Sequence, residues 1–352
     1  MQLPNDKALK DIFQIVLFGK GYGESILIHI GNDNYILIDS FKNPQTNAPI
    51  AIDYLLNVGL NENAIVGIIC SHWDNDHIQG IASIASKIQK PIDVYIPIAQ
   101  SSRDFERFVT FLQTNNNPEE PYSTSEYINL LKLNEQKKIH ICYTKAYTLL
   151  FPNLLSQMGK DSASIVALSP SEETVNSFIS AISLPREKDY IKNIRISNNN
   201  ISIVTLISRI VDNVLFGGDL ENTNNDWDII ASNYAFDEKC HVFKIPHHGS
   251  KNAYSEKVWE RMIEKPISII TRFNPSNLPT EENIDLIKKQ SEKVYIIGGE
   301  SKEDKKTGVK LKGTESDIRN NIRIIDKKIG LIRLSWKEKN WKVEKFGEVK
   351  EY

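Results

Sequence analysis

Apolar runs of strand length recur along the first hundred residues, separated by turns and short helical patterns. Residues 11–18 predict a strand, "GKGYGES" a glycine-rich turn, and "ILIHI" and "YILID" two strands joined at "GNDN". The continuous apolar run at 64–70 predicts a buried strand. Helices are predicted over 50–59 and 78–89, and "IDVYIP" predicts a further strand. This part of the chain therefore has an α/β pattern.

The pattern changes after residue 100. "RDFERFVTFLQ" and "EYINLLKL" have helical spacing and are separated by a loop-like stretch, which predicts a helical insertion. The β pattern then resumes. Strands are predicted over 162–168, 201–209, 213–217, 268–272 and 293–298, at "HVFKIP", and in a closing hairpin at "GLIRLSWKEKNWKVEKF". Helices are predicted over 253–264 and 280–290, and the lysine-rich residues 300–313 predict an exposed loop.

Strands precede helices in each half, and polar clusters follow the strands, as is typical of layered α/β folds that bind ligands at strand ends. We expect one domain over residues 1–352. Its parts would be a first half (1–99), a helical insertion (about 100–160), a second half (about 161–300) and a basic C-terminal β-hairpin extension (about 301–352).

Composition is that of a soluble globular protein, with 40% hydrophobic and 25% charged residues. The formal net charge of −2 excludes a polycation that coats nucleic acid with its whole surface. From Asp285 to the end, however, 18 Lys/Arg stand against 12 Asp/Glu. That excess fits either a basic face for an anionic polymer or an ordinary solvated surface.

The three cysteines, Cys70, Cys142 and Cys240, lie in apolar strand-like runs and form no CxxC pair. We expect them to be buried and reduced, which fits a reducing compartment. No run approaches the roughly 20 apolar residues of a membrane span, and the N-terminal segment has no signal-peptide pattern. The expectation is a cytoplasmic protein without membrane association.

Three polar segments each end a predicted buried strand. They contain His72, Asp74, Asp76 and His77 in "SHWDNDHIQG", Asp219 in "FGGDL", and His247 and His248 in "IPHHGS". Each segment alone also has a structural explanation, as a capping aspartate, a hydrogen-bonded core histidine or a turn. Taken together at one edge of a sheet, four histidines and three aspartates are typical ligands of zinc, manganese or iron.

These segments resemble the metallo-β-lactamase-fold hydrolases, most of all the hydrolase domain of ComEC-type DNA-uptake proteins and its stand-alone relatives. The similarity is carried by "FGKGYGESILIHIGNDNYILIDS", "SHWDNDHIQG", "NNNISIVTLISRIVDNVLFGGDLE", "FKIPHHGSKN" and "FNPSN", in the order of that family. It covers about residues 11–100 and 197–300. The resemblance implies a four-layer αββα sandwich.

The resemblance also implies metal ligands. Asp76 and His77 match the second metal position, Asp219 the bridging carboxylate and His248 the last histidine of that position. His247 would contact substrate or serve as the ligand in place of His248, and the sequence does not order the two.

The first metal position is altered. His72 matches it, but Asp74 replaces its usual second histidine and the family's further histidine is not evident. We therefore expect one or two divalent ions, zinc or manganese, and the carboxylate content shifts the preference towards manganese. Asp74 also indicates the DNA-uptake group rather than β-lactam chemistry.

Several other residues have two explanations. Asp39 would orient a ligand histidine or end a strand, and Ser250 and Lys251 would contact a phosphate or cap a helix and face solvent. Glu24 is interpreted as a polar turn residue. His140 is a weak candidate for the missing histidine, whereas His29 and His241 are interpreted as structural.

The expected activity is phosphodiester hydrolysis of DNA or RNA by a metal-activated water, with Asp76, His72, Asp74 and His247 in catalysis. No G-x-S-x-G or Walker motif offers another chemistry. Two alternatives stay open. One is a hydrolase of small phosphodiesters or esters, with the insertion as a lid. The other is a sensor with a degenerate site that binds protein partners in an uptake or defence system.

Overall fold

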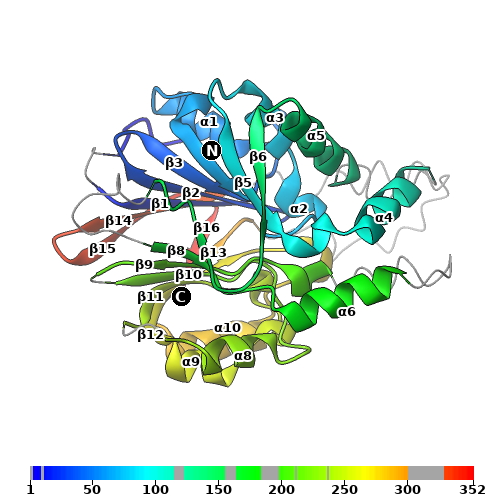
Figure 1. Ribbon diagram of the computed structural model, residues 1–352. Coiled ribbons are helices and arrows are strands. Elements are labelled where there is room, and N and C mark those ends of the chain that lie inside the picture. Colours follow the sequence, from blue (N-terminus) through cyan, green and yellow to red (C-terminus); the bar gives the residue numbers. More distant parts are fainter. Residues whose placement is uncertain are drawn as a thin grey trace, which may run out of the picture.

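Two eight-stranded β-sheets form the centre of the computed structural model (Figure 1). The structure describes residues 3–8, 12–114, 123–154, 164–183, 198–210, 212–235, 238–299 and 329–352. The first sheet has the order β15 (Asn340–Gly347), β14 (Gly330–Lys337), β1 (Gln14–Gly19), β2 (Glu24–Gly31), β3 (Asn34–Ile38), β4 (Ile65–Ile69), β5 (Ile92–Pro97) and β6 (Ile139–Thr144). The second has the order β16 (Val349–Glu351), β13 (Lys293–Ile297), β12 (Ile263–Thr271), β11 (Cys240–Lys244), β10 (Asn213–Phe216), β9 (Thr205–Ser208), β8 (Ser164–Ala167) and β7 (Thr148–Leu150).

The inner strands are buried on both faces, which explains their continuous apolar runs. In β3, Tyr35 and Leu37 belong to an apolar cluster between the first sheet and its helices. The alternate residues Ile36 and Ile38 belong to the cluster between the two sheets. Because successive side chains of a strand point to opposite faces, such a strand needs apolar residues at every position.

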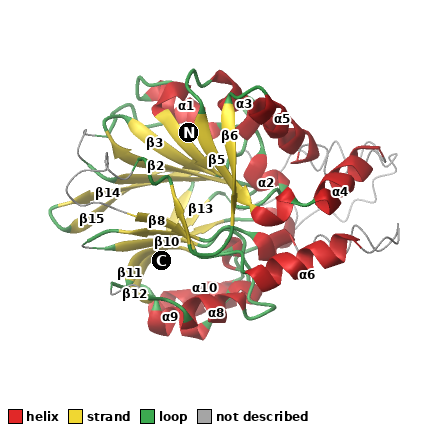
Figure 2. Cartoon of the chain, viewed as in Figure 1, coloured by secondary structure: helices red, strands yellow, loops and turns green. Residues whose placement is uncertain are grey.

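Helices cover the outer face of each sheet (Figure 2). The cluster on the first sheet includes side chains of α1 (Ile50–Asn57), α3 (Ile81–Lys87), α4 (Arg103–Thr114), α5 (Ser123–Glu135) and α6 (Glu172–Ser183). A separate cluster joins the second sheet to α8 (Asp226–Ser232), α9 (Glu256–Arg261) and α10 (Glu281–Gln290). This helix–sheet–sheet–helix order confirms the predicted α/β, four-layer αββα sandwich.

Some predicted elements differ in extent. The helix expected over 78–89 is two helices, α2 (Asn75–Ile78) and α3, because Gly80 between them has a left-handed φ of 87° that a helix cannot accommodate. The strand expected over 201–209 is shorter, since a 3₁₀ turn (Asn199–Ile201) precedes β9. Strand β12 begins at Ile263, ahead of the predicted 268–272.

The segment predicted as a helical insertion contains strands as well as helices. Helices α4 and α5 are present as expected, but β6 then pairs with β5 at the edge of the first sheet. The next strand, β7, pairs with β8 of the second sheet. The limits given for the parts of the domain remain a prediction. The lysine-rich residues 300–313 lie outside the described residues.

The C-terminal hairpin connects both sheets. Strand β14 pairs with β1 and β15 in the first sheet, and β16 pairs with β13 in the second. Cys70 and Cys240 are buried as expected, but Cys142 is partly exposed because β6 is an edge strand. In the part of the chain that the structure describes, no helix has the length and apolar character needed to cross a bilayer.

Candidate metal centre

The predicted polar residues meet where the ends of neighbouring parallel strands lie together. Asp39 follows β3 and His72 follows β4, and these two strands are parallel neighbours in the first sheet. Asp219 follows β10 and His248 follows β11, which are parallel neighbours in the second sheet. The carboxyl ends of parallel neighbours meet at one edge, so each sheet delivers its residues to the same side of the sandwich.

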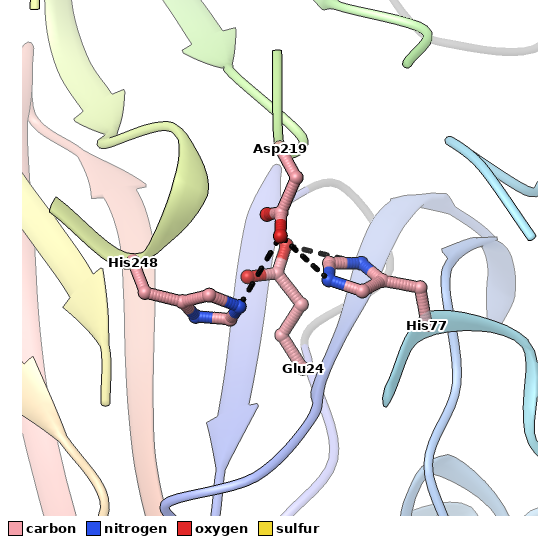
Figure 3. A group of neighbouring side chains, drawn as sticks. All are labelled: Glu24, His77, Asp219 and His248. Carbon is pink, nitrogen blue, oxygen red and sulfur yellow. Dashed lines mark ion pairs between the residues drawn. The ribbon is translucent and has the colours of Figure 1, made fainter. Parts of the chain in front are cut away.

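Four side chains converge closely enough to share one ion (Figure 3). One ligand atom from each of Glu24, His77, Asp219 and His248 lies within 4.8 Å of the others, and all four residues are buried. The Asp219 carboxylate lies between the two imidazoles: its Oδ2 is 3.4 Å from His77 Nε2 and 3.3 Å from His248 Nε2. Asp219 therefore occupies the centre of the cluster.

Asp76 approaches the same two imidazoles. Its Oδ2 lies 3.5 Å from His77 Nε2 and 3.4 Å from His248 Nε2. The structure thus brings together Asp76, His77, Asp219 and His248, the set predicted for the second metal position. Their service as ligands remains a prediction, and the set offers two nitrogens and two carboxylates, which suits zinc or manganese.

The far nitrogen of each cluster histidine is held by an acceptor. His77 Nδ1 donates to Asp39 Oδ2 at 2.8 Å, and His248 Nδ1 donates to the Thr271 carbonyl oxygen at 3.0 Å. A neutral imidazole that donates from Nδ1 carries its lone pair on Nε2. Both Nε2 atoms are buried and have no hydrogen-bond partner among the described residues. These orphaned nitrogens, aimed at carboxylate oxygens, fit a divalent cation.

His72 is oriented in the same way, by a hydrogen bond from its Nδ1 to Ser71. The Ser71 hydroxyl donates to Asp39 Oδ2 at 2.5 Å, so it accepts from His72 Nδ1 at 3.0 Å. His72 Nε2 is buried and also lacks a partner in the described part of the chain. Asp39 therefore orients two histidines, one directly and one through Ser71, which is the arrangement expected of a residue behind metal ligands.

In the cluster, burial and the attraction between opposite charges shift the pKa values in opposite directions. Burial lowers the pKa of His248, but Asp219 and Asp76 outweigh it and raise that pKa to about 9. Burial raises the pKa of Asp76, but the two histidines lower it to about 2. The same balance raises the pKa of His77 and lowers that of Asp219. The carboxylates therefore stay ionised, and a metal ion would compete with protons for the imidazoles.

The first metal position is less complete. His72 Nε2 lies 3.5 Å from Asp74 Oδ2, and the His72 and His77 rings are 4.2 Å apart. Asp74 is the more open of the pair, with 35% of its side chain exposed, and its other oxygen accepts from Asn198. Among the described residues, no further histidine joins this pair, so the position has one imidazole and one carboxylate.

Comparison with known proteins agrees with this architecture. Residues 18–136 match the profile of the metallo-beta-lactamase superfamily. The chain has a metallo-β-lactamase fold.

The solved structures to which the chain is similar are distant in sequence. The metallo-beta-lactamase fold protein YhfI from Bacillus subtilis has 11% identity and a TM-score of 0.41, over 78% of this chain and 91% of that one. A B3 metallo-beta-lactamase with an active site glutamic acid has 14% identity and a TM-score of 0.38, over 69% and 78%. A metallo-beta-lactamase from Cronobacter sakazakii has 13% identity and a TM-score of 0.36, over 64% and 74%. No curated protein sequence matches the chain.

Within this metallo-β-lactamase fold, the adjacent histidines face different partners. His248 is buried against Asp219, whereas His247 Nδ1 lies 3.1 Å from Glu221 Oε1 and its Nε2 is 3.4 Å from Asn199 Nδ2. The backbone has left-handed φ angles at both residues, 45° at His247 and 53° at His248, which directs the two side chains apart. The geometry therefore favours His248 as the ligand and leaves His247 beside the cluster.

Two glycines allow Asp219 to reach the cluster. A Cβ on Gly217 would lie 2.7 Å from the Pro246 side chain and 2.9 Å from its backbone nitrogen. Gly218 has a φ of 52°, a conformation that L side chains rarely adopt. The "GGD" segment thus packs closely against Pro246, just after β11, and places Asp219 just beyond β10.

Glu24 corrects one interpretation. It is not a polar turn residue: it begins β2, is 1% exposed and belongs to the cluster. Its Oε1 lies 4.0 Å from His77 Nδ1, the nitrogen that donates to Asp39. Its Oε2 accepts from Thr271 Oγ1 at 2.7 Å and pairs with Lys244. Glu24 is thus already paired within the protein, whereas ligation by Asp76 remains a prediction.

Lys244 was not predicted to be part of the site. It is fully buried at the end of β11, pairs with Glu24 and lies 3.9 Å from Asp219 Oδ1, and it donates to the Gly218 carbonyl at 3.2 Å. A lysine closing the apolar strand "CHVFK" directly before the histidines was the available signal, because a charge is buried at such a position only with a partner. The Lys244 side chain therefore lies between two carboxylates, those of Glu24 and Asp219.

The remaining candidates lie outside the cluster. Ser250 Oγ caps the turn that follows by accepting from Asn252 N, and Lys251 is exposed, 3.9 Å from Glu282. His140 is exposed on the edge strand β6. His29 is buried and His241 pairs with Asp212, which agrees with their structural interpretation. The proposed phosphate contacts of Ser250 and Lys251 remain predictions.

Replacing Asp39 with asparagine is expected to weaken metal binding about 10- to 100-fold, the usual effect of losing an outer partner of a ligand histidine. The asparagine cannot accept from His77 Nδ1 and from the Ser71 amide and hydroxyl with full carboxylate strength. The measurement is metal affinity by chelator competition, with Asp93→Asn on β5 as the matched control. An affinity equal to that of the unaltered chain would refute this role of Asp39.

Proposed function

We propose that the chain is a metal-dependent hydrolase of phosphodiesters, with DNA or RNA as its substrate class. The observation that carries the proposal is the set of buried imidazole nitrogens. Nε2 of His72, His77 and His248 is buried, has no partner in the described residues, and points to carboxylate oxygens. Leaving three such atoms unpaired is costly in a structure that does not bind a cation.

The residues that would hold the ion are those of the second position, Asp76, His77, Asp219 and His248. His72 and Asp74 would hold a second ion or contact the reactants. A divalent cation bound there favours ionisation of water and polarises the phosphoryl group.

The protein residues around this centre have separate roles. Asp39 and Thr271 hold the ligand histidines in one tautomer and orientation. Asp74 is the most open carboxylate of the site, so it is placed to accept the proton of the attacking water. His247 lies beside the cluster with 20% of its side chain exposed, where it would contact the substrate.

The substrate class rests on sequence rather than on geometry. The segments "SHWDNDHIQG" and "FKIPHHGSKN" resemble those of the DNA-uptake group, including the aspartate at position 74. The basic balance of the last part of the chain is consistent with an anionic polymer.

The test supplies the purified chain with Mn²⁺, Zn²⁺ or Mg²⁺ and offers labelled single- and double-stranded DNA, RNA and a small diester. We expect cleavage of a nucleic acid that is lost in Asp76→Ala and kept in His140→Ala, which alters an exposed histidine outside the site. Cleavage of the small diester alone would favour the small-molecule alternative. A chain that binds no metal and cleaves nothing would overturn the proposal in favour of a binding module.

A further inference from the structure

Two loops from opposite sheets are locked together beside the metal cluster. The loop between β1 and β2 meets the loop after β12, where the backbone N–H of Asn274 donates to the Gly21 carbonyl at 2.7 Å. Gly21 has a φ of 86°, and a Cβ there would lie 2.2 Å from Asn274 Nδ2. Gly23 has a φ of 101°, and its Cβ would lie 3.0 Å from the carbonyl oxygen of Asp76. This rim is therefore closely packed, and it lies against the backbone of Asp76, a proposed metal ligand.

Three rings form a row that starts at the cluster. Phe273 stacks on His248 with ring centroids 4.9 Å apart and an interplanar angle of 21°. Tyr22 lies against Phe273 with centroids 5.5 Å apart and an angle of 33°. Both aromatic side chains are only half-buried. An aromatic surface thus extends from a ligand histidine towards solvent, a surface on which planar groups stack favourably.

A cation stands at the end of this row. Lys20 Nζ lies 5.9 Å from the Tyr22 ring centroid and 4.9 Å from that of Phe41, and it donates to the Lys42 carbonyl at 3.0 Å. Burial lowers the pKa of Lys20 to about 8, and attraction to Asp76 opposes this shift. The ammonium is therefore shielded from water and attracted by the Asp76 carboxylate, and this shielding strengthens its interaction with an anion.

We propose that this rim is a nucleotide-binding subsite, in which Lys20 contacts the phosphate next to the metal centre and Tyr22, supported from behind by Phe273, stacks on the adjoining base. The inference rests on the proposed function and specifies its substrate as a phosphodiester that carries a nucleobase. Base–aromatic stacking tolerates any base, so the subsite predicts little sequence preference.

The test measures the Kd of a phosphorothioate dithymidine, which resists cleavage, for the full chain with Mn²⁺. The same diester with abasic sugars is measured for comparison. Tyr22→Leu is expected to raise the Kd of the dinucleotide about tenfold, within the range for losing one stacked base. It should leave the Kd of the abasic diester unchanged, and Tyr22→Phe should restore binding. Lys20→Met should weaken the binding of both ligands, and Lys20→Arg should weaken the binding of neither. Thermal unfolding of each variant controls for folding.

Failure of this subsite is distinguishable from failure of the enzyme. Three results would overturn the subsite. They are equal Kd values for the two diesters, no binding of either diester, and an equal loss of affinity for both diesters in Tyr22→Leu. Hydrolysis of cleavable diesters with and without bases at equal rates would keep the proposed activity and reject the subsite. Base-dependent binding without hydrolysis under any metal would keep the subsite and reject the activity.

Discussion

Replacing Asp219 with asparagine is expected to reduce hydrolysis by about 10³-fold or more. Asp219 follows β10, and its Oδ2 lies between His77 Nε2 and His248 Nε2, at 3.4 and 3.3 Å. Losing its charge weakens the hold on a cation whose Lewis-acid effect is worth several kcal/mol, and each 1.36 kcal/mol is tenfold in rate. The measurements are initial rates on the cleaved substrate and bound metal by elemental analysis.

The matched control for this variant is Asp212→Asn. Asp212 is also a buried aspartate beside a histidine, His241, but it is distant from the cluster and contacts Trp341 instead. We expect Asp212→Asn to keep activity and metal content. Equal rates in the Asp219 variant and the unaltered chain would show that the reaction occurs elsewhere.

Replacing Lys244 with methionine is expected to destabilise the chain by about 3–5 kcal/mol, the usual cost of removing one partner of a buried ion pair. The loss leaves the buried carboxylate of Glu24 without its cation, next to the carboxylate of Asp219. The measurement is the free energy of unfolding from denaturant titration.

The double variant Glu24→Gln, Lys244→Met separates charge from packing. If the pair matters through charge, the second substitution should restore most of the lost stability, because no uncompensated carboxylate remains. Additive losses in the double variant would show that Lys244 acts only by filling space. Glu24→Gln alone is expected to cost less than Lys244→Met, since it leaves a cation near Asp219.

The sequence predicts the fold and most of the cluster for an identifiable reason. Continuous apolar runs such as 64–70 mark strands buried on both faces, and the polar residues that follow such runs must lie at strand ends. Asp76, His77, Asp219 and His248 therefore meet in space although they are far apart in the chain. Strand β6 was indicated only by the apolar run around Cys142, inside a segment predicted to be helical. The signal is weak because β6 is an edge strand, and only its two end residues are buried.

Other features depend on side-chain geometry that spacing does not contain. The choice between His247 and His248 follows from two consecutive left-handed residues, which no periodicity indicates. Glu24 lies next to a glycine-rich turn, and only the pairing of β1 with β2 shows that it begins a strand. The two hydrogen-bond partners of Asp39, His77 and Ser71, are likewise distant from it in the sequence, so only the three-dimensional structure shows that one carboxylate binds both.

The most direct test of the metal centre is a crystal of the chain grown with Mn²⁺ or Zn²⁺, with diffraction data collected at the absorption edge of that metal. The account predicts an anomalous peak about 2.0–2.2 Å from Nε2 of His77 and of His248, in contact with the carboxylates of Asp76 and Asp219. Loss of this peak in a crystal of His248→Ala would agree with the same assignment. A crystal that contains one metal ion per chain but shows no anomalous peak among these four residues would contradict the assignment.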